Sequence, residues 1–198
     1  MRGTDRRGRV PAGGLLLALV LASWLNGCSR PAVPAPEPVK GVTTMNWSLT
    51  STAFANGARI PDRYAVRGEG VSPPLTWTAP PAGTRELALI CVDPDAPRGD
   101  FIHWVLYGLG PTVTSLPEAL PPSRQVGEPV CVQGMNSAGQ IGYTAPAPPP
   151  GTAHRYQFTL YAVDAPLDLA PGADESGLRA ALRGKLLGQT TLEGTYSR

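Results

Sequence analysis

The fold of this chain is indicated most clearly by Glu86-Leu87-Ala88-Leu89-Ile90-Cys91-Val92, followed directly by Asp93-Pro94-Asp95-Ala96-Pro97. A continuous apolar run of this length is typical of a β-strand buried on both faces. The two prolines lack the N–H group that a sheet ladder needs, so the strand has to end where they begin. We therefore expect a buried strand whose end carries two carboxylates, Asp93 and Asp95.

The composition favours a β-rich protein with many loops. The 198 residues include 23 Gly and 23 Pro, which disfavour long helices because Pro removes a backbone donor and Gly weakens a helix. With 42% hydrophobic and 16% charged residues, the chain is too apolar to be disordered. The expected further strands are Trp47–Ala53, Leu75–Thr78, Phe101–Tyr107, Arg155–Val163 and Thr190–Tyr196.

One segment, Glu175–Leu187, has the spacing of an amphipathic helix, with Asp174 as its N-cap. One helix among many strands predicts a mostly β domain.

The N-terminus has the order of regions of an export signal. Arg2, Arg6, Arg7 and Arg9 precede an apolar run, Leu15–Leu25, that is too short to span a bilayer as a helix. The run ends in Leu25-Asn26-Gly27-Cys28, which resembles a bacterial lipobox, the motif whose cysteine is lipidated. The alternative is an ordinary secretory leader with an incidental cysteine.

We accordingly expect a lipoprotein signal peptide over residues 1–27, a Pro-rich tether over 28–45 and one domain over 46–198. Residues 1–27 hold four Arg and one Asp, so their removal would turn the formal charge of +2 into −1. No basic patch then remains to bind nucleic acid, and membrane contact would come through a lipid at Cys28. The two remaining cysteines, Cys91 and Cys131, could pair in an oxidising compartment, which the sequence leaves open.

The chain has two histidines, and each begins a strand beside a turn-rich segment. If the strand ending at Asp93 and the strand containing His103 pair antiparallel, the loop between them brings these two residues together. His154 shares one strand face with Tyr156, because side chains alternate along a strand. We infer a pocket of Asp, two His and Tyr at the loop end of a sheet. Taken singly, Asp-Pro-Asp is more often a turn, and a lone histidine is more often structural.

Two motifs in this order resemble the signatures of the phosphatidylethanolamine-binding protein family, in its bacterial Raf kinase inhibitor-like branch. The first is Leu89–Pro97 followed by His103-Trp104-Val105, and the second is Gly142–Gly151 leading into His154-Arg155-Tyr156. The resemblance implies two packed antiparallel sheets with one or two short helices, and one small cavity for anionic or phosphate-bearing groups. It implies that the cavity is lined by Asp93, His103, Pro149, His154 and Tyr156, with Asp95, Gly142, Tyr143 and Gly151 in support.

One departure concerns the second motif, where Thr144-Ala145 stands in place of the two glycines usual in bacterial members. The added Cβ atoms could narrow the mouth of the cavity. Prolines donate no hydrogen bond, so backbone donors for an anion are expected from Gly142, Tyr143, Thr144, Ala145, Ala147 or Gly151.

The leading interpretation is an exported, lipid-anchored protein on the periplasmic side that binds a small anionic or phosphorylated ligand, with a phospholipid head group as one source. An inhibitor of an envelope protein such as a peptidase is the second. An Asp/His hydrolase is the third, and it is disfavoured because no motif places a Ser or Cys nucleophile beside a base. No cofactor and no metal site are expected.

Overall fold

The apolar run forms the central strand β3 (Glu86–Asp93) in the computed structural model, which describes residues 47–198. β3 lies in a six-stranded sheet of order β6-β7-β4-β3-β8-β9, between β4 (Phe101–Leu109) and β8 (Ala153–Val163). Both neighbours run antiparallel to β3. Every β3 side chain from Leu87 to Asp93 is buried, as the continuous apolar run predicts.

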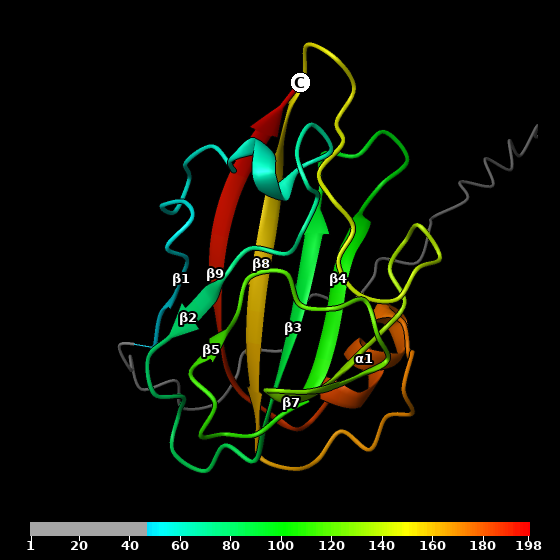
Figure 1. Ribbon diagram of the computed structural model, residues 1–198. Helices are drawn as coiled ribbons and strands as arrows, with labels where there is room; N and C mark the ends of the chain where they lie inside the picture. Colours follow the sequence, from blue (N-terminus) through cyan, green and yellow to red (C-terminus); the bar gives the residue numbers. More distant parts are fainter. Residues whose placement is uncertain (1–46) are drawn as a thin grey trace, which may run out of the picture. The chain divides into compact units, whose positions relative to one another are not determined.

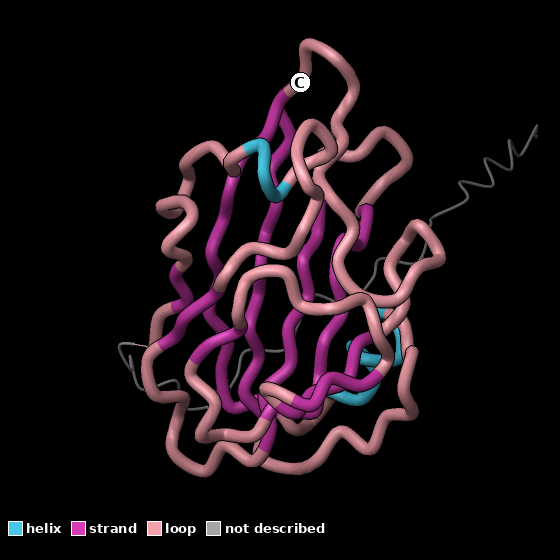
Figure 2. Tube along the Cα trace, in the orientation of Figure 1, coloured by secondary structure: helices cyan, strands magenta, loops and turns pink. Residues whose placement is uncertain are grey.

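A second, three-stranded sheet of order β1-β2-β5 packs on one face of the larger one (Figure 1). The other strands of the two sheets are β1 (Leu49–Thr50), β2 (Leu75–Trp77), β5 (Ser115–Leu116), β6 (Gln125–Gly127), β7 (Val130–Gln133) and β9 (Leu186–Ser197). Loops make up much of the rest (Figure 2). The fold is mostly β with two antiparallel sheets and one α-helix, which confirms the expected class.

Because side chains alternate along β3, they pack into two separate cores, one on each face of the large sheet. Leu87, Leu89 and Cys91 belong to the core shared with the small sheet, whereas Ala88 and Ile90 belong to the core on the opposite face. The second core is closed by α1 (Glu175–Leu182), which buries Leu178 and Leu182.

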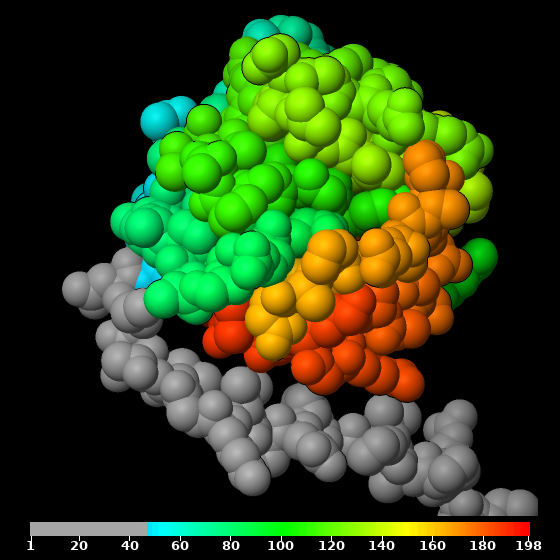
Figure 3. All heavy atoms as spheres, turned by 90° about the horizontal axis from the view of Figure 1, so that it is seen from below, coloured from blue at the N-terminus to red at the C-terminus, as the bar shows by residue number. Residues whose placement is uncertain are grey.

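The chain that follows β8 and contains α1, coloured orange, crosses the surface seen in Figure 3, and α1 packs against β4. Hydrogen bonds tie it there: the Tyr107 hydroxyl donates to the Ala170 carbonyl, and the Met135 N–H donates to the Ala173 carbonyl. In residues 47–198, no helix has the length and hydrophobicity needed to cross a membrane.

Several expected boundaries were wrong. The first strand covers only Leu49–Thr50 of the predicted Trp47–Ala53. The helix ends at Leu182 instead of Leu187, because Gly184 adopts φ +74° and the chain turns into β9, which therefore begins four residues earlier than predicted. The sequence reading missed β5, β6 and β7, which are two to four residues long.

Cys91 lies on β3 and Cys131 on β7, with β4 between these strands, and both are buried free thiols. The structure thus answers the disulfide question that the sequence left open. The expected signal peptide, Cys28 and the tether lie outside the described residues.

Candidate functional site

The carboxylate of Asp93 lies at the end of β3 and is only 4% exposed. Its Oδ1 accepts a hydrogen bond of 2.9 Å from the Asp95 N–H, which is the turn contact expected of an Asp-Pro-Asp sequence. Its Oδ2 accepts a hydrogen bond of 2.7 Å from Nδ1 of His154, which is also buried. Both carboxylate oxygens are therefore used, which is how a buried charge is tolerated.

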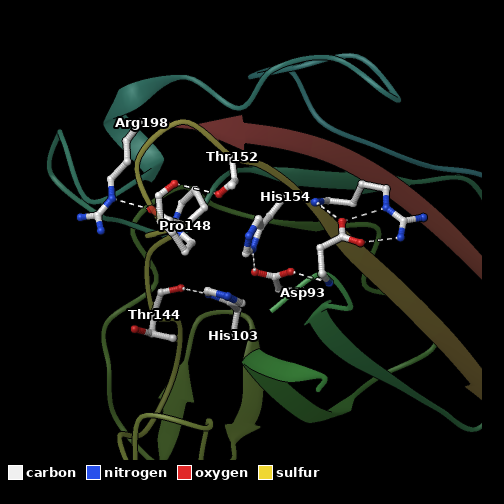
Figure 4. Close-up of polar contacts among 10 residues, drawn as sticks. Asp93, His103, Thr144, Pro148, Thr152, His154 and Arg198 are labelled. Atoms are coloured by element: carbon white, nitrogen blue, oxygen red, sulfur yellow. Dashed lines mark hydrogen bonds and ion pairs between the residues drawn. The ribbon is translucent and has the colours of Figure 1, made fainter. Parts of the chain in front are cut away.

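A β-bulge places His103 on the side of this carboxylate. The register between β3 and β4 passes from Cys91 opposite Trp104 to Val92 opposite Ile102, so His103 is an extra residue on β4. A bulge re-aims a side chain, and here the imidazole lies against the ring of Tyr156, 5.0 Å between centroids, on the face of Asp93. Figure 4 shows the Asp93 carboxylate between the rings of His154 and His103.

The backbone of Thr144 fixes the orientation of His103. Nδ1 of His103 lies 2.7 Å from the Thr144 carbonyl oxygen, and the Thr144 N–H donates to the His103 carbonyl at 2.8 Å. Burial lowers the pKa of His103, and the charge of His154 adds to this, whereas the Thr144 carbonyl and Asp93 oppose it. The ring is therefore neutral at physiological pH.

Tyr156 is fully buried on β8, and its hydroxyl has no hydrogen-bond partner in residues 47–198. Burial first, and then the negative charge of nearby Asp93 together with a hydrogen-bond interaction toward the same carboxylate, raise the pKa of this phenol. The hydroxyl nevertheless lies outside hydrogen-bonding geometry with that carboxylate, and in this sense it has no partner among the described residues. Asp93, His103, His154 and Tyr156 thus lie together, as the sequence interpretation placed them.

Asp95 turns away from this group and binds Arg155, a partner that the sequence reading did not assign. The guanidinium donates twice to its carboxylate, at 2.7 and 2.9 Å, and the Arg155 N–H donates as well. These bonds lower the pKa of Asp95 to about 2. Since the folded-state pKa is the lower one, the pair stabilises the fold above the ordinary pKa of 3.8, and this contribution is lost as pH falls through about 2. Asp95 therefore holds β8 to the end of β3.

Half of the six expected backbone donors are already used inside the protein. The N–H of Gly142 donates to Gly134, that of Thr144 to His103, and that of Gly151 to Arg198. Within the described residues, the N–H groups of Tyr143, Ala145 and Ala147 remain without such bonds.

The other supporting residues shape the second loop. Gly142 and Gly151 take φ values of +90° and +79°, which favour glycine. The Tyr143 hydroxyl donates to the Tyr64 carbonyl, while the Pro149 carbonyl accepts from Thr152 and is not in hydrogen-bond contact with Asp93 or either histidine. The Arg198 side chain donates to the Pro148 carbonyl, which ties the end of β9 to this loop (Figure 4).

Neither Thr144 nor Ala145 has a positive φ, so the two side chains cause no backbone strain. Asn136, which the sequence reading missed, orders the start of the loop: its amide donates to Gly142, and its carbonyl oxygen accepts from Ala138 and Gln140.

A separate hollow of about 240 Å³ lies on the helix side of the sheet and involves none of the predicted site residues. It is lined by Ile102, Met135, Asn136, Ser137, Asp174, Glu175 and Ser176. Among residues 47–198, no three His, Cys, Asp or Glu side chains are grouped to hold a metal ion.

The unpartnered hydroxyl of Tyr156 leads to a prediction. A buried polar group without a partner costs about 1–3 kcal/mol, so Tyr156→Phe should leave the melting temperature unchanged or raise it. Thermal unfolding followed by circular dichroism measures this, with Tyr161→Phe, on the opposite face of β8, as the control. A larger loss of stability in Tyr156→Phe than in the control would contradict the assignment.

Comparison with known proteins identifies relatives of this chain. An archaeal relative from Methanothermobacter thermautotrophicus, named UPF0098 protein, is 44% identical over 151 residues, covering 76% of this chain and 99% of the relative. A Mycobacterium tuberculosis protein named "Putative lipoprotein LppC" is 37% identical over 202 residues, covering 95% of this chain and 96% of the relative.

Two solved structures share the fold. CT736 from Chlamydia trachomatis, described as a phosphatidylethanolamine-binding protein homologue, superposes with a TM-score of 0.70 at 39% identity, covering 77% of this chain and 97% of that one. YbcL from E. coli gives the same TM-score at 26% identity, covering 78% and 99%. The profile of the family described as phosphatidylethanolamine-binding protein matches residues 50–197. The chain therefore belongs to the phosphatidylethanolamine-binding protein family.

Proposed function

We propose that this chain is a lipid-anchored binding protein of the cell envelope, whose pocket at the end of β3 takes a small anionic or phosphate-bearing ligand without converting it. The observation that carries the proposal is the group of two buried histidines and one unpartnered tyrosine hydroxyl around Asp93. A buried polar group without a partner points to a ligand or water that completes it. A phospholipid head group is one source of a phosphate that would fit.

The histidines are the groups that can compensate the charge of an anion. Asp93 alone would repel a phosphate, but a proton gained by His103 or His154 offsets that repulsion. Each ring already uses Nδ1, so the proton would be carried on Nε2. Binding of an anion should then be coupled to uptake of a proton.

The surroundings of His103 and His154 favour binding without turnover. In the described part of the chain, no Ser, Thr or Cys side chain is hydrogen-bonded to either histidine, so neither ring is paired with a side-chain nucleophile. The nearby thiol of Cys91 is fully buried, and burial raises its pKa well above the ordinary value.

The proposed anchor is supported by a relative. The alignment with LppC covers 95% of this chain, so it has to include most of the residues before Trp47. Together with the lipobox-like sequence ending in Cys28, this supports attachment to the membrane through a lipid.

Calorimetry with inorganic phosphate tests the proposed pocket. Because the pKa of ligand-free His103 is lowered, affinity should rise as pH falls from about 8 and should continue to rise below about 6.5. Replacing His103 or His154 by Ala should weaken binding about tenfold or more, since a charge-assisted hydrogen bond contributes about 1.5–3 kcal/mol. Tyr161→Phe serves as the control. Affinity that is independent of pH, or unchanged in both His variants, would refute the assignment.

The anchor has its own test. The full chain expressed in a bacterium with lipoprotein processing should partition with the membrane fraction, and Cys28→Ala should appear in the soluble exported fraction. Ser29→Ala provides a matched change next to the cleavage point. If Cys28→Ala partitions with the membrane fraction as the wild-type chain does, the lipid anchor is overturned, and the pocket proposal is unaffected.

A further inference from the structure

The hydrogen bonds of the two histidines determine which ring nitrogen holds the proton. A carbonyl oxygen can only accept, so Nδ1 of His103 carries the hydrogen that it shares with Thr144. The carboxylate of Asp93 likewise accepts from Nδ1 of His154. In both rings the proton of the neutral imidazole is therefore held on Nδ1.

A neutral imidazole has one N–H, so neutral His103 presents a bare lone pair at Nε2, and His154 presents another in its neutral form. Figure 4 shows both rings directed into the space between Thr144, Pro148 and Asp93. This space thus offers two acceptors and lies next to a buried negative charge. The unpartnered donor beside it is the hydroxyl of Tyr156.

We propose, on the basis of the function proposed above, that the pocket selects oxyanions that bring a hydrogen of their own, and therefore takes hydrogen phosphate in preference to sulfate. At about pH 8, both anions are tetrahedral dianions of similar size, and they differ by one proton. Sulfate has only acceptor atoms, so the imidazole lone pairs and the carboxylate would repel it. Hydrogen phosphate donates its P–OH to one Nε2, and its other oxygens accept from Tyr156 and from free backbone N–H groups.

The preference depends on the charges that face His103. These are the Asp93 carboxylate on β3, and His154 and the neutral Tyr156 hydroxyl on β8, together with the Thr144 carbonyl dipole. The neighbouring cation, Arg155, is bound to Asp95. Acidification protonates Nε2 of His103, which turns an acceptor into a charged donor. Phosphate becomes a monoanion over the same range while sulfate stays a dianion, so sulfate should then bind at least as tightly as phosphate does.

The hydrogen can come from two sources, the hydroxyl of a free phosphate or the ammonium group of a lipid head group. Glycerophosphoethanolamine has a diester phosphate without a proton and carries an ammonium group. Dimethyl phosphate has the same diester without any donor. If glycerophosphoethanolamine binds and dimethyl phosphate does not, the hydrogen comes from the ammonium of the head group. If inorganic phosphate binds and neither diester does, the hydrogen comes from the P–OH.

Isothermal titration of the folded chain with phosphate and with sulfate tests the selectivity. At about pH 8, we expect phosphate to bind at least about tenfold more tightly than sulfate. Near pH 5, where His103 gains a proton and phosphate is a monoanion, the ratio of the two affinities should fall to about one or below. Equal affinities at pH 8 would overturn the inference while leaving the proposed anion site standing. Failure of every anion to bind at either pH would overturn the proposed function itself, and the inference with it.

A variant gives a second readout. The amide of His103→Gln can donate a hydrogen at any pH. The ratio of phosphate affinity to sulfate affinity at pH 8 should therefore fall toward one in this variant, while Tyr161→Phe keeps the wild-type ratio. If His103→Gln does not fold, the pH series on the wild-type chain still decides the question. A wild-type ratio in a folded His103→Gln would contradict the role of Nε2.

Discussion

The site depends on one buried hydrogen bond, 2.7 Å long, between Nδ1 of His154 and Oδ2 of Asp93. A carboxylate at 4% exposure is costly unless its oxygens are hydrogen-bonded, and the second oxygen is bound by the Asp95 N–H. Breaking the bond would leave an uncompensated charge at the end of the central strand. The bond also fixes the tautomer of His154, and with it the chemistry that the pocket offers a ligand.

The fold brings these groups together through strand pairing and one irregularity. β3 and β8 pair closely enough that His154 and Tyr156 arrive beside Asp93, and Arg155 secures the same junction from outside through Asp95. β4 contributes His103 only because a bulge adds a residue to its ladder with β3. The loop of the second motif then supplies the Thr144 carbonyl that holds the ring.

The sequence predicted the central strand and the meeting of Asp93, His103, His154 and Tyr156, because burial patterns and turn residues are local signals. It could not predict the bulge, since register depends on which neighbours pack, and nothing in Phe101–Leu109 marks His103 as the extra residue. The use of three backbone donors within the protein was also hidden, because two of them depend on partners far away in the chain, His103 for Thr144 and Arg198 for Gly151. Arg155 could have been found, since it is an exposed cation next to His154 on a strand paired with the one that leads to Asp95.

The central claim is that Nδ1 of each histidine carries a proton and that His103 is neutral at the pocket. Nitrogen-15 NMR of the imidazole rings tests it directly, and the chain has only two histidines to assign. At about pH 8, the account predicts a proton on Nδ1 of both rings and an unprotonated Nε2 at His103. The Nε2–H tautomer at either His103 or His154 would contradict it.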